Sequence, residues 1–452
     1  MKTWIRHYLE YIKFSFWFVP GLMVLGAMLL SFSAVALDKQ LNLYTHDALR
    51  FLYSGGVDGA RSILATIAGS MMTVAGVTFS ITIVALTLAS SQFGPRLLRN
   101  FMKDRGNQVV LGSFIATFIY CILVIRSVTT KETSDFVPDI AVTLAVIMSL
   151  INVGILIYFI HHVSVSIQAD KVISRVYRDL LGHLENLFPT ELGYESVENR
   201  EQAADATAAD ASDSRRHGVA ATASGYLQAI DDDGLMEYAT RENLLVRLHF
   251  RPGEFITTGD IIATVECDED IPENAAAGVE GALILGERRS AEQDAEFAVD
   301  QLVEIALRAL SPGVNDPFTA ISCIDWLGSA LCFLTTREIP SPYRHDGDDV
   351  LRIVAKAVTF EGIMNAAFDQ IRQCGRSNVA VMVRLMAALK KIAGHARTAE
   401  QRQAVMRQAK MILRASRESF PETNDKKDVS SHYQDLLECK KDGLTAYMEE
   451  CG

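Results

Sequence analysis

Four long apolar segments dominate the first third of the chain. Each is long enough to cross about 30 Å of hydrocarbon as a helix. We place them at about Phe14–Leu37, Ile63–Ser90, Val109–Val128 and Ile140–Ser164. No later apolar run reaches ~18 residues. Residues 1–165 are therefore predicted to form a four-span helical membrane domain, with the remainder of the chain outside the bilayer.

The distribution of basic residues predicts the orientation of these spans. Lys and Arg concentrate before the first span, between the second and third, and after the fourth: Lys2, Arg6, Lys13, Arg96, Arg99, Lys103, Arg105, Lys171, Arg175 and Arg178. The loop between the third and fourth spans is mostly acidic. Because cytoplasmic loops are enriched in Lys and Arg, we expect both termini to lie in the cytoplasm.

The second span carries a stripe of hydroxyl side chains. Several of them recur at seven-residue intervals, which keeps them on one side of a helix. The stripe consists of Thr66, Ser70, Thr73, Ser80, Thr87 and Ser91, with Gly69 and Gly76 at its edge. Such residues allow close packing of helices in a membrane. They also suit the wall of a water-filled conduit, so both interpretations remain open.

Three polar residues near the ends of the spans are candidates for a pore mouth. Arg126 lies near the outer end of the third span, and His161 and His162 lie at the inner end of the fourth. Each is also explained by simple placement at the membrane interface. The central parts of the four spans contain no Asp or Glu. Ion-coupled carriers usually need such a carboxylate, so a passive pore is favoured.

The pattern changes after the fourth span. Residues 166–190 have the periodicity of an amphipathic helix, and residues 191–222 are an Ala/Asp-rich stretch typical of a flexible insert. Residues 223–285 contain the short β-rich runs "SGYLQAID", "LLVRLHF" and "DIIATVE", separated by the turn signals "DDDG", "RPGEF" and "TTGD". Gly253 and Gly259 fall where tight turns need glycine. This module resembles the biotinyl/lipoyl β-sandwich of carrier proteins, but Ser224–Gly281 contains no lysine, so no covalent cofactor is expected.

Residues 286–420 are predicted to form a helical domain, followed by an acidic helical tail at 421–452. Ser290 and Gln293 have the spacing of a capping box. Asp294, Asp300 and Glu304 are interpreted as a solvated helix face. Further amphipathic stretches are predicted at about Asp348–Arg372, Asn378–Gly394, Ala399–Ser416 and Ser431–Glu449.

The segment "SPGVNDP" interrupts this helical region. It consists of Ser311, Pro312, Gly313, Val314, Asn315, Asp316 and Pro317. Pro312 and Gly313 are expected to end one helix. Asp316 followed by Pro317 has the pattern of an N-cap with proline at the first helical position. The end of one helix and the N-cap of the next are therefore sufficient to explain the motif, without a catalytic role.

Composition and charge exclude several classes of function. The 452-residue chain has a net charge of −12, which argues against a nucleic-acid partner. Its seven cysteines include no C-x-x-C pair, so neither a disulfide framework nor a zinc ribbon is expected. No nucleophile–base arrangement, phosphate-binding loop or H-E-x-x-H motif is present. We expect no enzyme activity, metal or cofactor.

Two stretches carry a resemblance to a known family. They are "RRSAEQDAEFAVDQLVEIALRALSPGVNDPFTAISCIDWL" and, in the second span, "FSITIVALTLASSQFGPRLLRNF". From about Tyr8 to Ser416 the chain resembles the bacterial membrane-protein family catalogued as domain of unknown function 2254. The resemblance implies a four-span inner-membrane protein with a cytoplasmic C-terminal portion.

The expected fold is an α-helical integral membrane protein with four transmembrane helices and a cytoplasmic α+β region, comprising a small β-sandwich module and a helical domain. The first functional hypothesis is a passive ion or small-solute channel. Four spans enclose too little space for a pore, so we expect a homo-oligomer in the lipid bilayer. The alternative is a membrane-anchored sensor or scaffold whose cytoplasmic domain binds a protein or a small ligand.

Overall fold

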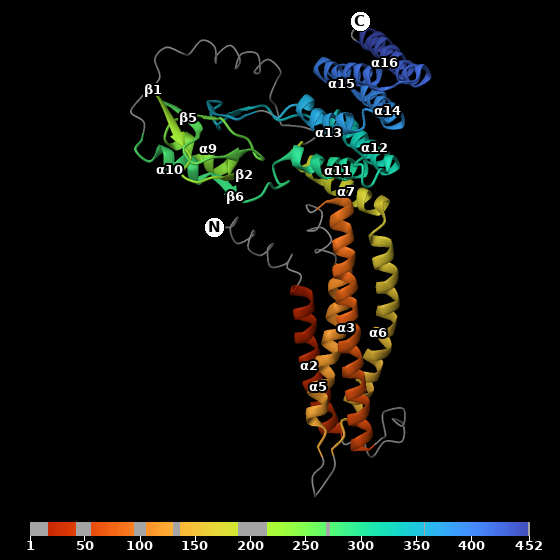
Figure 1. The fold of residues 1–452 in the computed structure, drawn as a ribbon. Helices are drawn as coiled ribbons and strands as arrows, with labels where there is room; N and C mark the ends of the chain where they lie inside the picture. Colours follow the sequence, from red (N-terminus) through yellow and green to blue (C-terminus); the bar gives the residue numbers. More distant parts are fainter. Residues whose placement is uncertain are drawn as a thin grey trace. The chain divides into compact units, whose positions relative to one another are not determined.

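The computed structural model describes residues 17–41, 56–94, 105–129, 136–188, 215–267, 272–356 and 358–450. Most of the basic residues used to predict the orientation, and the predicted insert as far as residue 214, lie outside these ranges. The chain divides into two compact units, Met1–Lys171 and Val172–Gly452 (Figure 1). Each unit is described by itself below.

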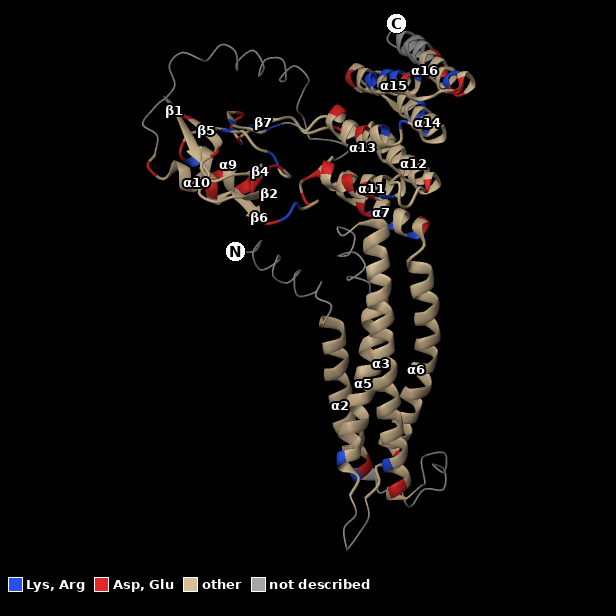
Figure 2. Cartoon of the chain, in the orientation of Figure 1, with Lys and Arg blue, Asp and Glu red and all other residues tan. Residues whose placement is uncertain are grey.

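The described residues of the first unit form a bundle of four long helices. They are α2 (Phe18–Leu41), α3 (Val57–Phe93), α5 (Arg105–Ser127) and α6 (Asp139–Ser166). Helix α5 packs against the other three and buries large side chains, including Phe114, Tyr120 and Val124. Charged side chains are absent from the middle of these helices and gather near their ends (Figure 2). This distribution is the one expected of helices that cross a membrane.

Polar contacts join the helices where α2 and α5 end and α6 begins. The carboxylate of Asp38 accepts hydrogen bonds from the backbone amides of Ile140 and Ala141, both at 3.0 Å. The Tyr120 hydroxyl donates to the Ala141 carbonyl at 3.0 Å. Asp38 therefore satisfies amide groups in the first turn of α6, which has no partners for them within its own helix.

Five described helices are long and apolar enough to cross a membrane, one more than the sequence predicted. The fifth is α12 (Pro317–Leu334), which belongs to the second unit. The expectation that no apolar run after the fourth span reaches this length was therefore wrong. Helix α12 packs against α11 (Ala295–Ala309) and α14 (Val379–His395), and this internal position explains its apolar composition.

Helix α7 (Ala169–Leu187) occupies most of the predicted amphipathic segment. Its apolar face is buried in the second unit through Val172, Ile173, Val176, Leu180 and Leu184. At the edge of this face, the centroid of the Tyr177 ring lies 4.3 Å from that of Trp326 on α12. The Tyr177 hydroxyl is 2.8 Å from the hydroxyl of Ser329. Helix α7 is therefore an integral part of the second unit.

Among the described residues of the second unit, eight strands form two sheets. The five-stranded sheet has the order β1-β5-β3-β8-β7, and the three-stranded sheet the order β4-β2-β6. All pairings are antiparallel except that of β3 with β8. The strands are β1 (Arg215–Ala220), β2 (Gly225–Ile230), β3 (Leu245–Leu248), β4 (Phe255–Ile256), β5 (Ile261–Cys267), β6 (Leu283–Gly286), β7 (Tyr343–His345) and β8 (Leu351–Val354).

This β module differs from the predicted β-sandwich, which is not confirmed. It includes two helices, α9 (Asp232–Arg241) and α10 (Ala275–Gly281), and they share one apolar core with the strands. The predicted turn "DDDG" begins α9, with Asp231 as its N-cap. The residues that favour turns also favour helix N-termini, so the local pattern did not distinguish them.

Two predicted boundaries of the module were also wrong. Strand β1 lies within the segment 191–222 assigned to the insert, and it pairs with β5. Strand β8 lies within the predicted amphipathic stretch Asp348–Arg372 and pairs with β3. Both strands are short and have a partner distant in sequence, which local periodicity does not reveal, although β8 also pairs with the preceding strand β7.

Five further helices complete the second unit around α12. Besides α11 and α14 they are α13 (Phe360–Cys374), α15 (Ala399–Ser419) and α16 (Thr423–Glu450). Helices α13, α14 and α15 begin at side-chain caps supplied by Thr359, Asn378 and Thr398. They occupy most of the stretches in which helical periodicity was predicted.

Candidate functional site on helix α3

The hydroxyl stripe predicted for the second span lies on the face of α3 that points away from the other described helices of the bundle. All six of its residues are exposed: Thr66, Ser70, Thr73, Ser80, Thr87 and Ser91. The opposite face of α3 is buried in the bundle through Leu64, Ala68, Met71 and Ala75. The stripe therefore does not pack α3 against the other described helices of its own chain.

Several of these hydroxyl groups already bond to their own helix. The hydroxyls of Thr66, Thr73 and Thr87 donate to the carbonyls four residues earlier, at 2.7, 2.9 and 2.9 Å. Ser91 donates to the Leu88 carbonyl at 2.9 Å. Each such bond uses the hydroxyl proton and leaves oxygen lone pairs on the exposed face. The hydroxyl groups of this face are therefore neutral, and they accept hydrogen bonds more readily than they donate, with the exposed side chains of Val77 and Val84 between them.

The structure adds small residues to this face that the sequence interpretation treated as marginal or missed. Gly59, Ser62, Gly69 and Gly76 are exposed in line with the hydroxyls. With Thr66, Thr73 and Ser80 they recur at alternating intervals of three and four residues. A side chain added at Gly69 or Gly76 would meet nothing within 4 Å. The three–four interval was the signal by which they could have been found, because it marks a helix-packing seam.

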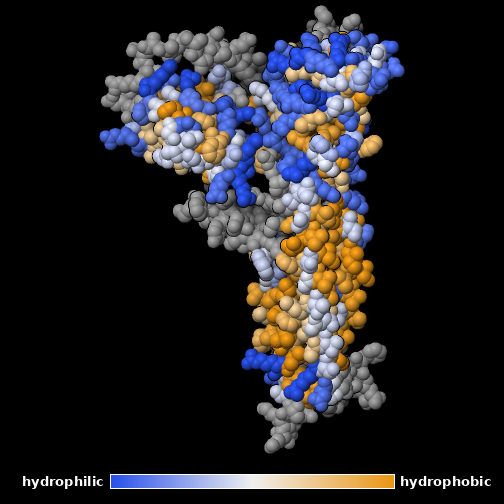
Figure 3. Space-filling model, viewed as in Figure 1, coloured by the Kyte–Doolittle hydropathy of each residue, from blue (hydrophilic) through white to orange (hydrophobic). Residues whose placement is uncertain are grey.

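The other outward faces of the bundle have a different character. Large apolar side chains are exposed on α2 and α6, including Leu22, Leu29, Leu150, Ile151 and Ile157. Figure 3 shows the contrast as a pale band of near-neutral hydropathy that runs along the bundle between orange flanks. Lipid chains suit the large apolar faces, whereas the face of α3 suits another helix or water.

The predicted pore-mouth residues do not come together. Arg126 is exposed in the last turn of α5, close to the start of α6. His161 and His162 lie more than twenty residues along α6 from its start at Asp139, which corresponds to about 33 Å of helix. His162 stacks on Tyr158, with its Nδ1 3.4 Å from the tyrosine hydroxyl. The three residues therefore mark opposite ends of the bundle.

A buried polar contact at mid-height of the bundle was missed by the sequence analysis. Asn152 of α6 is 2% exposed, and its amide nitrogen donates to the Thr117 hydroxyl at 2.7 Å. The same nitrogen lies 3.4 Å from the sulfur of Met71. Asn152 thus joins α6 to both α5 and α3. A lone Asn in an apolar segment was the available signal, because such a residue must find a partner away from water.

The "SPGVNDP" motif forms the tight connection between α11 and α12. Asp316 is the N-cap of α12 as predicted: its carboxylate accepts from the amides of Phe318 and Thr319 at 3.1 and 3.2 Å. Asn315 has a φ of 49°, a conformation that Asn tolerates better than most residues. The remaining residues of the motif, Ser311, Pro312 and Gly313, lie in the same turn, and Ser311 donates to the Arg308 carbonyl.

Two predictions for the start of α11 were wrong. The N-cap is Asp294, which accepts from the amide of Phe297 at 3.0 Å, and Ser290 does not cap this helix. Asp294 is also buried rather than solvated. Arg289 forms one ion pair with Asp294 at 2.7 Å and another with Asp300 at 2.9 Å. Burial raises the pKa of Asp294 above its ordinary value, with opposing contributions from its hydrogen bonds. Among the described residues, no group of three or more His, Cys, Asp or Glu side chains could hold a metal ion.

The fold and the apolar helices define a membrane protein with several helices long enough to span a bilayer and a separate unit of mixed α/β and helical structure. The chain belongs to the family described as predicted membrane protein (DUF2254), which it matches over residues 13–391. It is similar to uncharacterized proteins from two Mycobacterium tuberculosis strains and from Mycobacterium bovis. Each is 31% identical over 386 residues, which cover 83% of this chain and 72% of the relative. No solved structure matches the chain.

Proposed function

We propose that the protein is a passive channel for ions or small solutes, formed by a homo-oligomer in the bacterial inner membrane. The observation that carries the proposal is the row of exposed hydroxyl groups along one face of α3, which the exposed side chains of Val77 and Val84 interrupt. Its hydroxyl oxygens, repeated along the helix axis, would replace water around a permeating solute.

The pore is proposed to lie between copies of the chain. Helix α5 fills the centre of the bundle, where Phe114, Tyr120 and Val124 are buried. A central cavity formed by several copies of α3 would instead use a surface that the single chain leaves open. The seven-residue spacing of Thr73 and Ser80 would then give two polar rings ~10 Å apart along the axis.

We count four spans in this proposal and assign α12 to the cytoplasmic region. Helix α12 carries Asp325, which pairs with Arg384 of α14, and it packs between neighbouring helices of the second unit. An internal helix of a soluble domain can be as apolar as a membrane span. The predicted orientation, with both termini in the cytoplasm, is retained.

A second function is favoured by the small residues of α3. Glycines at alternating intervals of three and four residues allow two helix backbones to approach closely, which leaves little room for water. The chain would then be a dimeric membrane-anchored sensor or scaffold, and α3 would serve only for association. This alternative makes the opposite prediction for the accessibility of the stripe.

Cysteine substitution along α3 separates the two functions. In the channel, flux into liposomes becomes sensitive to a small thiol reagent after Thr73→Cys or Ser80→Cys, but not after Phe79→Cys. Ser80→Leu blocks flux without loss of assembly, because leucine is favourable in hydrocarbon. In the scaffold, Ser80→Leu weakens the oligomer and a cysteine at residue 80 stays unlabelled. Flux no higher than that of empty liposomes, with labelling only at residue 79, would eliminate the channel.

A further inference from the structure

Three basic side chains form a row along helix α7. Lys171, Arg175 and Arg178 recur at intervals of four and three residues, which places them on one face of the helix. Lys171 and Arg178 are exposed, and Arg175 is half-buried. The two ends of this basic row are separated by about 10 Å along the helix axis.

The basic row lies on the side of α7 opposite its apolar face. At about 100° per residue, the centre of the row is about 160° around the helix from the centre of the buried side chains. Those side chains are Val172, Ile173, Val176, Leu180 and Leu184. An amphipathic helix on a membrane usually turns its apolar face to the lipid. In α7 that face is already buried in protein, so contact with a membrane would use the charged side.

The charges of the row are not neutralised by their neighbours. Within the described ranges, Lys171 has no ion-pair partner. Arg178 donates from its Nε to the carbonyl of Ser174 at 3.4 Å, which leaves its terminal nitrogens available. The acidic residues of α7 lie on the flanks of the row or two turns beyond it: Asp170, Asp179 and Glu185. The row therefore presents an excess of positive charge.

The chain itself holds the start of α7 close to the bilayer surface. The 28 residues of α6 extend for about 42 Å, which matches the hydrocarbon core together with both headgroup layers. Helix α7 begins at Ala169, three residues after Ser166 ends α6, so the two helix ends lie within about 11 Å of each other. This distance is similar to the range over which a charged membrane surface acts at physiological salt.

We propose that the basic row binds the headgroups of anionic phospholipids at the membrane surface from which α6 emerges. Phosphate oxygens accept charge-assisted hydrogen bonds from the ammonium group of lysine and the guanidinium groups of arginine. The contact lays α7 along the membrane surface while its apolar face stays in the second unit. It does not depend on whether α3 lines a pore or on which compartment this surface faces.

Fluorescence quenching in vesicles tests this contact on the full-length protein. Gly182 follows Arg178 by four residues on the same face, and a Cβ atom there would meet nothing within 4 Å, so Gly182→Cys can carry a fluorophore in a background without reactive native cysteines. The vesicles consist of phosphatidylcholine, with or without about 30% phosphatidylglycerol, and contain a lipid with a spin-labelled headgroup as the quencher. We expect quenching at least twofold stronger with phosphatidylglycerol. Equal quenching in the two kinds of vesicle would overturn the proposal.

Salt provides a second measurement that leaves the row unaltered. At about 0.5 M salt, quenching in the anionic vesicles should return to the level seen in phosphatidylcholine, because charges at a surface are screened. An effect of phosphatidylglycerol that survives this salt concentration would also overturn the proposal. This result stands even if substitutions in the row prevent folding.

A triple variant assigns the contact to the basic row. The combined changes Lys171→Gln, Arg175→Gln and Arg178→Gln should abolish the effect of phosphatidylglycerol on the label at residue 182. If that effect persisted with unchanged thermal unfolding, the row would not be the contact.

Helix α15 offers a matched control for the triple variant. It carries one lysine and two arginines at the same spacing, all of them exposed and none beside a membrane span: Lys410, Arg414 and Arg417. Their combined replacement by glutamine removes the same charge from the second unit and should leave the quenching unchanged. An equal loss in this control would mean that the net charge of the unit, and not the basic row, attracts the lipid.

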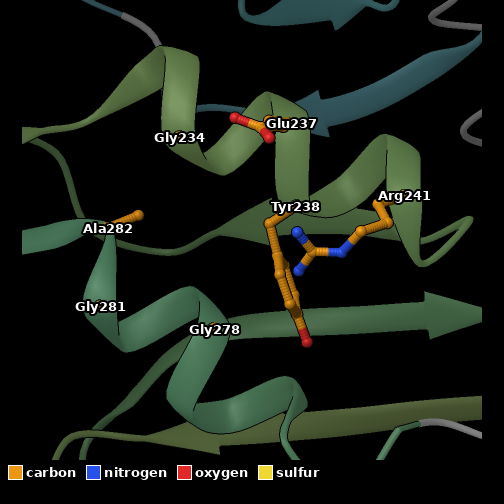
Figure 4. Close-up of a pocket in the computed structure, with 7 residues that line it drawn as sticks. All are labelled: Gly234, Glu237, Tyr238, Arg241, Gly278, Gly281 and Ala282. Atoms are coloured by element: carbon orange, nitrogen blue, oxygen red, sulfur yellow. The ribbon is translucent and has the colours of Figure 1, made fainter.

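A second label position distinguishes this contact from adsorption of the whole second unit. Gly281 is exposed in the β module, beside a hollow of about 240 Å³ between α9 and α10 (Figure 4). A Cβ atom there would also meet nothing within 4 Å, so Gly281→Cys can carry the same fluorophore. Phosphatidylglycerol should increase quenching at residue 182 and not at residue 281; an equal increase at both would overturn the proposal. Since no flux is measured, failure of the channel leaves this result unaffected.

Discussion

Single polar residues determine how the helices of this protein begin and meet. Asp316 starts α12, Asp38 binds the first turn of α6, and Asn152 joins three helices within the bundle. Each of these side chains satisfies backbone or side-chain groups that would otherwise lack partners away from water. Their contribution is local, so substitutions at these positions test one contact at a time.

Asp316 provides the clearest test at this scale. Asp316→Ala should lower the free energy of unfolding of the second unit by about 0.5–2 kcal/mol, because two amides at the start of α12 lose their acceptor. Asp316→Asn should be nearly silent, since Asn is an equally good cap. Thermal unfolding and amide exchange at residues 318–322 measure the effect. A loss of function in Asp316→Asn with fold and assembly intact would instead require a role for the charge.

Close approach between helices depends on one glycine in α5. A Cβ atom at Gly112 would lie 2.7 Å from the sulfur of Met23 and 3.1 Å from Cα of Pro20 on α2. Gly112→Val should therefore separate α2 from α5 and destabilise the bundle by about 1–3 kcal/mol. Gly154→Val in α6 is the control, because a Cβ there meets nothing within 4 Å. The two variants are compared by their resistance to denaturation in detergent. Equal resistance of both variants would contradict the close α2–α5 contact at Gly112.

The β7–β8 hairpin is predicted to weaken in acid. Hydrogen bonds from Arg352 and from the amide of Val350 lower the pKa of Asp346. A carboxylate whose folded pKa lies below its unfolded value of about 3.9 stabilises the fold above that value. The stabilisation is lost as the pH falls through the folded pKa. The protection factors of the amides of residues 343–354, which are exchange rates corrected for the pH dependence of an unstructured chain, should therefore fall between about pH 5 and pH 2.

Asp346→Asn is the control for this effect. The variant should show weaker protection at neutral pH, because the Arg352 contact loses its charge, and little further change in acid. If the wild-type hairpin kept the same protection throughout this range, Asp346 would not be its acid-sensitive contact.

The sequence predicted elements whose signals are local. The membrane helices, α7 and α14 followed from length and periodicity, and strands β2, β3 and β5 from short runs of β-formers between turns. Gly253 and Gly259 have the positive φ that their turns require. Two failures are non-local, because β1 pairs with β5 and β8 with β3. The burial of Asp294 was missed although its partner Arg289 is only five residues away, because periodicity does not show ion pairs.

The candidate site was predictable only in part for the same reason. Periodicity placed the hydroxyls on one face of α3, but the direction of that face depends on contacts with α5 and α6. The hydrogen bond from Asn152 to Thr117 joins residues 35 positions apart, so the local sequence around either residue does not predict it. The hollow between α9 and α10 was inaccessible to prediction, since the sequence interpretation contained neither helix.

For the whole molecule, the predicted orientation is the property that decides which compartment each unit faces. A cysteine introduced at Asp135 should react with an impermeant thiol reagent from the periplasmic side of intact cells, and one at Ser212 should react only after lysis. The reason is the excess of Lys and Arg on the segments assigned to the cytoplasm. A background variant without reactive native cysteines is the control, and the reverse labelling pattern would refute the orientation.

The hydrogen bonds within α3 also bear on how copies of the chain would meet. Because Thr66, Thr73 and Thr87 bond to carbonyls of their own helix, their hydroxyl protons need no second chain. At these three positions a single copy can thus reside in lipid without the cost of unmet donors. Association along α3 would then obey mass action in the plane of the membrane, so that the ratio of protein to lipid, rather than folding itself, sets the fraction assembled.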